Sequence, residues 1–322
     1  MSVSKVSVIM NAYNAEKYLK EAINSVFLQT YQSWEIIFWD NVSTDKTAEI
    51  VKEYDERLRY FCGENHVSLG QARNYALEKA TGEYITFLDC DDLWEPEKLK
   101  LQLSLLRDKP EVKLVYSDGY IIDGKGDCLE VFSKKYNFHK GSVFKELMKK
   151  NFIPFQSIMV KKDIFKEILF SENFEVVEDL DVILKIAYKY QIDYVNQKLI
   201  KYRWHSENTS HRAIEAPLKE FVEIRKFWVN EISNKVIGVF LRRLLSKDYL
   251  NYGIWLFEQG RFQDARKAIA LSLLPPCIFS LKLAYVKYFL SFLPLKFNLS
   301  LLHLFRELKA CLSRFEKTQS NM

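Results

Sequence analysis

Short apolar runs alternate with helical segments along the first part of the chain, and this alternation limits the folds open to it. Strand-like runs occupy Val6–Met10, Glu35–Trp39, Tyr84–Leu88 and Lys113–Tyr116, and apolar residues recur every three or four positions in between. Parallel strands need a crossover connection, usually a helix, whereas antiparallel strands can be joined by a tight turn. The alternation therefore predicts an α/β fold, with a mostly parallel sheet covered by helices on both faces.

Capping signals place the helices. In the first half we expect helices capped by Asn14 and by Asp45, a helix over Leu69–Ala80 that stops at Gly82, and one from Pro96 to about Leu106. Beyond about Asn208 the strand signals fade, and Leu218–Trp228, Val236–Tyr252 and Gln263–Leu274 have the periodicity of amphipathic helices.

Charge is divided unevenly along the chain. The net charge is +5, but residues 1–211 balance to −4 and residues 212–322 to +9. We therefore predict an α/β domain over 1–211 and a basic α-helical region over 212–322. An acidic half that binds an anionic substrate would need a metal ion, and a basic half suits an anionic partner.

The C-terminal stretch Leu281–Leu312 is rich in Leu, Phe and Tyr, but lysines and a proline interrupt it. It contains no uncharged apolar run of the roughly 18–20 residues that span a bilayer. Two alternatives remain. Residues 281–322 lie in a membrane interface as a peripheral contact, or they pack as an ordinary helical bundle, on themselves or on a second subunit in a homo-oligomer.

Several classes of protein are disfavoured. The five cysteines are odd in number and include no CxxC pair, which argues against a disulfide scaffold or a structural zinc site. The first strand-like run begins at Val6 and leaves no room for a signal peptide, so we expect a cytoplasmic protein. Neither a GxGxxG motif after the first strand nor a GxxxxGK[ST] motif occurs, so a dinucleotide fold and a P-loop are both unsupported.

Carboxylates follow the predicted strands at the edge where open parallel sheets bind ligands. Asp40 ends the second strand, and Asp89, Asp91 and Asp92 follow the third. Three carboxylates within four residues repel one another and are stabilised by a cation, and all-oxygen ligands suit Mn²⁺ or Mg²⁺. The alternative is a helix-capping acidic turn before Pro96. It accounts for one aspartate more easily than for three.

Five segments, taken together, resemble the family-2 inverting glycosyltransferases with the GT-A fold. They are VSVIMNAYN (Val6–Asn14), SVFLQTY (Ser25–Tyr31), EIIFWDNVSTDKT (Glu35–Thr47), ARN (Ala72–Asn74) and GEYITFLDCDD (Gly82–Asp92). The resemblance covers about the first 210 residues and keeps motif order and spacing. It implies transfer of a sugar from a nucleotide donor to an acceptor hydroxyl with inversion, and a divalent metal between the acidic motif and the diphosphate.

The resemblance also implies roles for individual residues on the donor side. Asp40 would accept a hydrogen bond from the nucleobase, most often uracil, and Asn11, Ala12 and Tyr13 would line the base and ribose pocket. Asp91 and Asp92 would hold ribose and metal, with Asp89 bracing the turn. Arg73 would lie near the phosphates or the Asp40 loop, with an ordinary helix-surface arginine as the alternative.

The proton acceptor is expected on a separate element. Glu178 and Asp179 resemble the family's acidic pair at a helix N-terminus, with Asp179 as general base; alternatively, they complement a helix dipole. His205 would be a metal ligand, a diphosphate contact or a structural residue, and Arg203 would brace the acidic pair. Trp94 would stack on sugar or fill the core.

The sequence departs from the usual pattern near the base. Asn41-Val42 replaces the common Asp-Gly after the base-binding aspartate, and Asn11 stands where Pro or Thr is frequent. The sequence as a whole predicts a metal-dependent inverting glycosyltransferase that uses a nucleotide-sugar, with UDP as the expected nucleotide. A glycan or lipid-linked acceptor in surface polysaccharide synthesis is expected, at the inner membrane face and without nucleic acid. The alternatives are a catalytically silent nucleotide-sugar-binding scaffold and, less favoured, a sugar nucleotidyltransferase.

Overall fold

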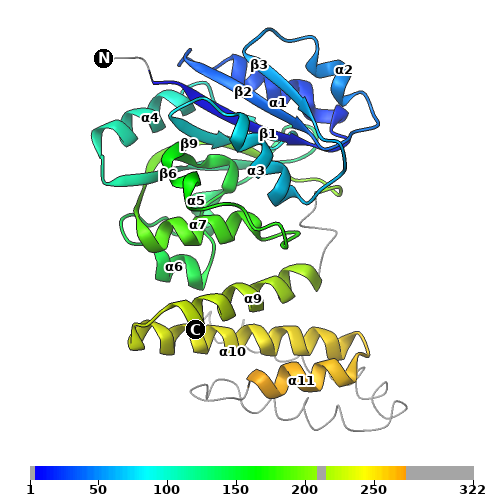
Figure 1. The fold of residues 1–322 in the computed structure, drawn as a ribbon, viewed down its shortest axis with the longest axis vertical. Coiled ribbons are helices and arrows are strands. Elements are labelled where there is room, and N and C mark those ends of the chain that lie inside the picture. The colour runs from blue at the N-terminus through cyan, green and yellow to red at the C-terminus, as the bar shows by residue number, and fades with distance from the viewer. Residues whose placement is uncertain (1–3, 209–214, 273–322) are drawn as a thin grey trace. The chain divides into compact units, whose positions relative to one another are not determined.

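A computed structural model of the chain describes residues 4–208 and 215–272 (Figure 1). The chain divides into two compact units, with the boundary between Ile214 and Glu215. The sequence placed this boundary between His211 and Arg212.

The first unit is built on one mixed sheet in the order β3-β2-β1-β4-β8-β6-β9-β5, with β7 paired to β6. Its strands are β1 (Val6–Ala12), β2 (Trp34–Asp40), β3 (Leu58–Cys62), β4 (Tyr84–Phe87), β5 (Leu93–Trp94), β6 (Val112–Ile122), β7 (Cys128–Val131), β8 (Met159–Lys161) and β9 (Gln191–Arg203). β3, β2, β1 and β4 are parallel, as are β6 and β9, while β8 runs antiparallel between the two groups. The predicted α/β class is confirmed.

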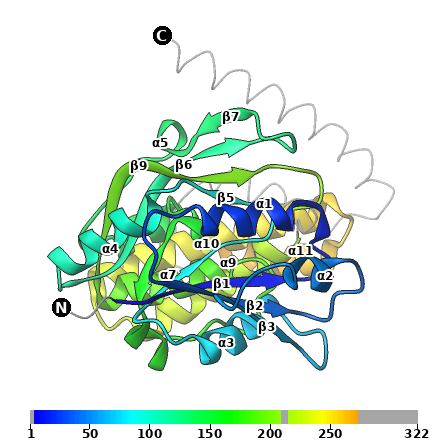
Figure 2. The ribbon, with the colours of Figure 1, turned by 90° about the horizontal axis from the view of Figure 1, so that it is seen from above.

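Helices cover both faces of the sheet. They are α1 (Glu16–Phe27), α2 (Thr47–Val51), α3 (Leu69–Lys79), α4 (Lys98–Asp108), α5 (Phe132–Lys135), α6 (Phe144–Lys149) and α7 (Glu178–Lys189), with 3-10 turns η1 (Phe155–Ser157) and η2 (Lys162–Lys166). α1 and α3 lie on opposite faces of β1 and β2 (Figure 2).

The four predicted strands are confirmed, and five strands were missed. β9 carries alternating polar and apolar residues with lysines, and β5, β7 and β8 are only two to four residues long, so none has the apolar run of a buried strand. β3 lies at the edge of the sheet and is half-buried.

Two capping expectations are wrong. Asn14 does not cap α1; it has a φ of +52° and accepts a hydrogen bond from the Thr44 amide instead. The amide of Glu16, at the start of α1, donates to Asp45, which also accepts from Thr47 and so serves α1 and α2 together. Gly82 does not end α3. A Cβ there would lie 2.6 Å from the Ser7 amide nitrogen, so close packing on β1 requires the glycine.

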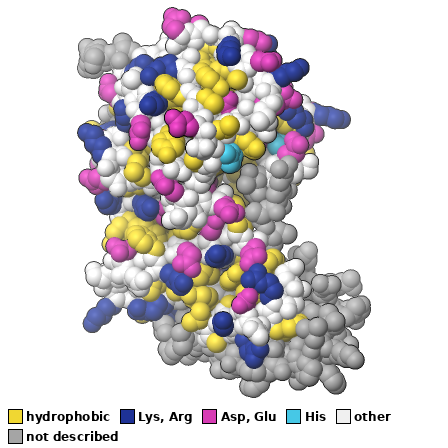
Figure 3. All heavy atoms as spheres, turned by 45° about the vertical axis from the view of Figure 1, so that its right-hand side comes forward, with side chains coloured by type: hydrophobic (Ala, Val, Ile, Leu, Met, Phe, Trp, Pro, Cys, Tyr) yellow, Lys and Arg dark blue, Asp and Glu magenta, His cyan; other side chains and the backbone are white. Residues whose placement is uncertain are grey.

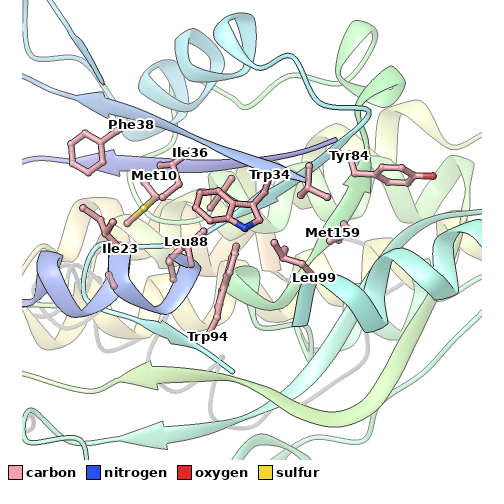
Figure 4. Close-up of a cluster of buried hydrophobic side chains, with 14 of the residues drawn as sticks. Met10, Ile23, Trp34, Ile36, Phe38, Tyr84, Leu88, Trp94, Leu99 and Met159 are labelled. Carbon is pink, nitrogen blue, oxygen red and sulfur yellow. The ribbon is translucent and has the colours of Figure 1, made fainter. Parts of the chain in front are cut away.

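The core of the first unit lies between the sheet and helices α1 and α4 (Figure 4). Trp34, Trp94, Met10 and Leu99 are among its buried side chains. Trp94 donates its indole N–H to the Gln156 carbonyl oxygen, so its core role is confirmed.

The second unit is helical over its described part. It contains α9 (Glu215–Glu231), α10 (Lys235–Glu258) and α11 (Phe262–Ser272), which confirms the three helices expected there. α10 and α11 pack closely at Gly253, where a Cβ would lie 2.6 Å from an Ile269 side-chain carbon. In residues 4–208 and 215–272, no helix is long and apolar enough to cross a membrane. The expected membrane or packing contact of 281–322 lies outside the described residues.

Candidate active site

A cleft of about 370 Å³ lies in the first unit. It is lined by the end of β1, the turn after β4, the start of α7 and the end of β9. Nine of the predicted site residues line it: Asn11, Ala12, Tyr13, Arg73, Asp89, Asp91, Glu178, Asp179 and His205. A second hollow of about 660 Å³, near Leu77, Tyr84 and Leu169, contains none of them.

Asp91 lies at the centre of a polar group that joins the acidic turn to the end of β9. Its Oδ2 lies 2.9 Å from Nε2 of His205 and 3.3 Å from the Asn208 side-chain amide nitrogen. Burial and the nearby Asp89 raise the pKa of Asp91, and His205 partly offsets this. The structure thus brings together Asp91 and His205, which are 114 positions apart in the sequence.

Asp92 does not line the cleft. Its side chain is fully buried, and Oδ1 accepts a hydrogen bond from the Arg203 amide at 2.7 Å. Burial raises the pKa of Asp92 well above its usual range. The expectation that Asp92 holds ribose or metal is therefore unsupported by its position, because the carboxylate faces the protein interior.

Arg203 also differs from expectation. Its guanidinium donates to the Asp91 carbonyl oxygen at 2.9 Å and to Glu21 at 2.7 Å, so it braces the acidic turn and not the Glu178–Asp179 pair. That pair is braced by Arg73, whose Nη1 lies 2.5 Å from Glu178 and whose Nη2 lies 3.4 Å from Asp89.

Arg73 is buried against aromatic rings, which rules out the helix-surface alternative. Its guanidinium lies 4.3 Å from the centroid of the Phe155 ring and 5.4 Å from that of Phe170. It comes from α3, begun by Ser68, whose hydroxyl accepts the Gln71 amide. Because Arg73 contacts Glu178 and Asp89, it ties the acidic pair to the acidic turn across the cleft.

Glu178 and Asp179 are adjacent but differ in their contacts. Burial raises the pKa of Glu178 to about 7, although the Arg73 guanidinium opposes the rise. Its Oε2 is buried and has no hydrogen-bond partner among the described residues. Asp179 is half-buried; its Oδ1 accepts the Leu180 amide at 2.5 Å, and burial raises its pKa too.

Asp40 lies behind the cleft wall. Its carboxylate accepts hydrogen bonds from the Ser43 amide and the Tyr60 hydroxyl, both at 2.8 Å. It is buried and does not line the cleft, but the sheet register pairs it with Ala12, which does.

The departures from the family pattern have visible structural consequences. The side chain of Asn41 donates to the Val67 carbonyl oxygen at 2.8 Å and accepts from the Val67 amide at 3.1 Å. An aspartate could not make the first of these bonds. Val42 has a φ of +68°, a conformation that glycine adopts freely and a β-branched residue rarely does.

Two residues of the site have no signal in the sequence. Gln156 lines the cleft and donates to Asp89 at 2.8 Å. The His66 ring lies 4.3 Å from the Tyr13 ring between centroids, tilted by 57°, and its Nδ1 lies 3.1 Å from the Asn41 carbonyl oxygen. Gln156 lies in the short 3-10 turn η1 and His66 in an irregular segment, and each is far along the chain from its partner, so periodicity gives no guide.

A metal ion would find a partial ligand set here. Among residues 4–208 and 215–272, no three His, Cys, Asp or Glu side chains are grouped to hold a metal between them. Asp91 and His205 supply one carboxylate and one imidazole donor 2.9 Å apart in the cleft. The carboxylate suits a divalent cation whose remaining ligands are diphosphate oxygens and water, whereas the imidazole is not a usual ligand of Mg²⁺.

Solved structures confirm the fold that the sheet defines, the GT-A fold. The structure of residues 1–349 of S. aureus TarS in complex with UDP superposes with a TM-score of 0.63 at 18% identity, over 94% of this chain and 91% of that one. The mannosyltransferase PcManGT of Pyrobaculum calidifontis, in complex with GDP-Man and Mn²⁺, gives a TM-score of 0.59 at 18% identity, over 84% of this chain and 75% of that one.

Sequence comparison gives the family. Residues 7–169 match the model described as glycosyl transferase family 2, and the chain belongs to that family. WfgD of Escherichia coli, named as a UDP-Glc:alpha-D-GlcNAc-diphosphoundecaprenol beta-1,3-glucosyltransferase, is 30% identical over 252 residues, which make up 77% of this chain and 91% of WfgD.

Proposed function

We propose that this glycosyltransferase moves a sugar, with inversion, from a UDP-sugar to an acceptor hydroxyl of a glycan or lipid-linked glycan in surface polysaccharide synthesis. One observation carries the proposal. Arg73 bonds to Glu178 and Asp89, so the acidic pair and the acidic turn share one cleft. A proton acceptor and a polyphosphate-binding turn on opposite sides of a cleft suit a single displacement at an anomeric carbon.

Asp179 would act as the general base. It would take the acceptor's hydroxyl proton while that oxygen bonds to the anomeric carbon and the bond to the diphosphate oxygen breaks, leaving the nucleoside diphosphate with the electron pair. A positioned general base typically raises the reaction rate by about 10²–10⁴-fold. Since bond formation and cleavage occur on opposite faces of the sugar, no covalent enzyme intermediate is required.

Arg73 and Glu178 would position the base. The buried Arg73–Glu178 ion pair fixes the first turn of α7, which carries Asp179. Asn11 offers the donor nucleotide a hydrogen bond, because its side-chain N–H group is buried and has no partner in the described part of the chain. Tyr13 and His66 form an exposed aromatic edge against which a base or ribose could pack.

If a divalent ion binds, Asp91 and His205 would hold it, and it would neutralise charge on the departing diphosphate. The family, the Mn²⁺ complex of PcManGT and the donor types at the cleft support this part of the proposal. They do not choose between Mn²⁺ and Mg²⁺. UDP is favoured over GDP by the resemblance around Asp40 and by the donor in the name of WfgD.

A peripheral membrane contact through residues 281–322 belongs to the same proposal. Its support is the basic, aromatic composition of that segment and the lipid-linked acceptor in the name of WfgD. A lipid-linked acceptor brings the reacting hydroxyl to a bilayer surface, where a basic segment is attracted to anionic lipid.

A donor panel tests the function. UDP-, GDP- and dTDP-sugars would be screened by thermal shift with and without Mn²⁺, since a ligand that binds the native state raises the melting temperature. Sugar transfer or donor hydrolysis would then be measured for each stabilising donor. Stabilisation by UDP-sugars with neither reaction would favour the silent scaffold, and release of diphosphate from a nucleoside triphosphate and a sugar phosphate would favour a nucleotidyltransferase.

A further inference from the structure

A line of three aromatic rings leads from the cleft toward exposed lysines. We name Tyr202, Phe132 and Tyr136 the aromatic strip. Tyr202, near the end of β9, lines the cleft. The Phe132 ring in α5 lies 6.2 Å from that of Tyr202 between centroids, and the Tyr136 ring lies 6.1 Å farther on, tilted by only 29° from Phe132. All three rings are half-buried, so each keeps part of its surface exposed.

Two ammonium groups share the far end of the strip. Nζ of Lys150 lies 4.5 Å from the Tyr136 ring centroid, and Nζ of Lys135 lies 5.8 Å from it. Both lysines are exposed, and neither forms an ion pair with an acid of residues 4–208 or 215–272. Two cations at one ring, without a neighbouring carboxylate, favour an anion beside them.

The surrounding segment is basic as well. Between Phe132 and Lys150, Glu146 is the one acid, and Lys134, Lys140 and Lys145 are exposed. α5 packs against β6 and β7 (Figure 2). On the face drawn in Figure 3, acidic and basic side chains are interspersed.

We propose that the aromatic strip, with Lys135 and Lys150, is an acceptor subsite for a sugar diphosphate. The inference rests on the proposed function and specifies the acceptor's chemical class. The reacting sugar would pack on Tyr202 near Asp179, and the diphosphate would lie at Tyr136 between the two ammonium groups. The charges are complementary, because ammonium groups form short, strong hydrogen bonds with phosphate oxygens.

An anionic bilayer surface could also attract these lysines. The ring positions favour the acceptor. A membrane contact requires only exposed charge, whereas the rings here form a continuous path that ends at a residue lining the catalytic cleft. A bilayer is therefore an outcome of the test and not part of the proposal.

Binding of octyl diphosphate tests the subsite in the full-length protein. The titration would use saturating UDP, so that the donor site is filled, with octyl glucoside as the neutral probe. Lys135→Gln and Lys150→Gln should each weaken octyl diphosphate binding roughly three- to tenfold and the double variant more, because each removes one charged contact. Lys52→Gln, at an exposed lysine on another element, is the matched control and should change nothing.

The ring contribution has its own variants. Tyr136→Phe should keep the affinity for octyl diphosphate, and Tyr136→Ala should lose it, because the ring and not the hydroxyl holds the lysines together. Unchanged octyl diphosphate affinity in the double lysine variant would overturn the proposal. It would also fail if the two lysines affected only co-sedimentation with phosphatidylglycerol vesicles, the result a bilayer contact predicts.

This test is separable from the function itself. Lysine-dependent binding of octyl diphosphate without sugar transfer would leave the subsite standing and refute the proposed activity. Suppose instead that sugar is transferred, and that the KM of a diphosphate-bearing acceptor equals that of a neutral acceptor both in the wild type and in the double variant. This result would support the activity and refute the subsite.

Discussion

Glu178 and Asp179 show how neighbouring carboxylates acquire different roles from their contacts. Arg73 pairs with Glu178 in the interior, so that carboxylate is committed to holding α7 in place. Asp179 accepts a hydrogen bond from the adjacent Leu180 amide and lines the cleft. A base must reach the proton that it removes, and these contacts are the reason why we propose Asp179 rather than Glu178 as the base.

Asp179→Asn should therefore leave donor binding near the wild-type value while kcat falls by about 10²–10⁴-fold, because the amide keeps the shape but cannot accept the proton. Steady-state kinetics together with UDP titration would measure both effects. Asp163→Asn, on an exposed aspartate that pairs with Lys113, is the control and should retain full kcat. A variant Asp179→Asn with wild-type kcat would assign the base to another residue.

Val42, two residues after the end of β2, is a strained position. A β-branched residue at a φ of +68° pays a steric cost that glycine does not. Val42→Gly should raise the free energy of unfolding by on the order of 1 kcal/mol, after part of the gain is lost to the greater freedom of glycine in the unfolded chain. Urea unfolding would measure it.

Val131→Gly is the matched control for that experiment. Val131 is also half-buried but has an ordinary extended backbone, with a φ of −118°, so the same substitution should destabilise the protein. Equal losses of stability at Val42 and Val131 would show that the positive φ stores no strain.

At the scale of elements, Glu35 connects β2 to the start of β1 and to the loop before β4. Its carboxylate accepts hydrogen bonds from Ser7 at 2.7 Å and from the Thr81 hydroxyl at 2.6 Å, and it pairs with Lys5 and Arg59 at 3.0 Å each. Burial alone would raise the pKa of Glu35, but these hydrogen bonds outweigh it and lower the pKa to about 2.

The lowered pKa gives Glu35 a pH-dependent share of stability. Since the folded-state pKa lies below the unfolded value of 4.5, the stabilisation is fully present above about pH 4.5 and is lost as pH falls toward 2. Glu35→Gln should reduce the free energy of unfolding at pH 7 by on the order of 3 kcal/mol, less what the amide's own hydrogen bonds restore. Urea titrations from pH 7 down to pH 2.5 should show the gap between wild type and variant closing below pH 4.5. A constant gap would contradict the assignment.

The elements also show what the sequence could and could not predict. β1, β2 and β4 are buried and mostly apolar, and Asp89 and Asp91 closely follow β4. The existence of these strands and the placing of the two aspartates beside the cleft therefore follow from local pattern. The orientation of Asp92 does not, because it depends on an amide of Arg203 that is 111 positions away. The partners of Arg73 could not be predicted from the sequence for the same reason, because Glu178 is 105 positions away. Long-range pairing decides which of several adjacent carboxylates turns inward.

At the scale of the whole molecule, charge and chemistry are divided between the parts of the chain. The cleft and all of its lining residues belong to residues 1–208, whose part of the chain is slightly acidic, while the excess of lysine and arginine lies after residue 211. An enzyme whose acceptor is carried by a lipid gains from such a division, because the basic part can meet an anionic surface without lowering the affinity of the carboxylate cleft for a cation.

Replacing Lys282, Lys287 and Lys296 together with Gln in the full-length chain tests the membrane proposal. Each lysine near an anionic surface contributes about 1 kcal/mol, so co-sedimentation with phosphatidylglycerol vesicles should fall steeply and its salt dependence should weaken. Vesicles of phosphatidylcholine should give little binding with either protein. The control replaces three exposed lysines of the first unit, Lys52, Lys125 and Lys166, with Gln. It removes the same charge and should bind the vesicles as the wild type does. If the variant at Lys282, Lys287 and Lys296 binds vesicles as the wild type does, and light scattering shows an altered oligomeric state, these lysines pack against protein instead.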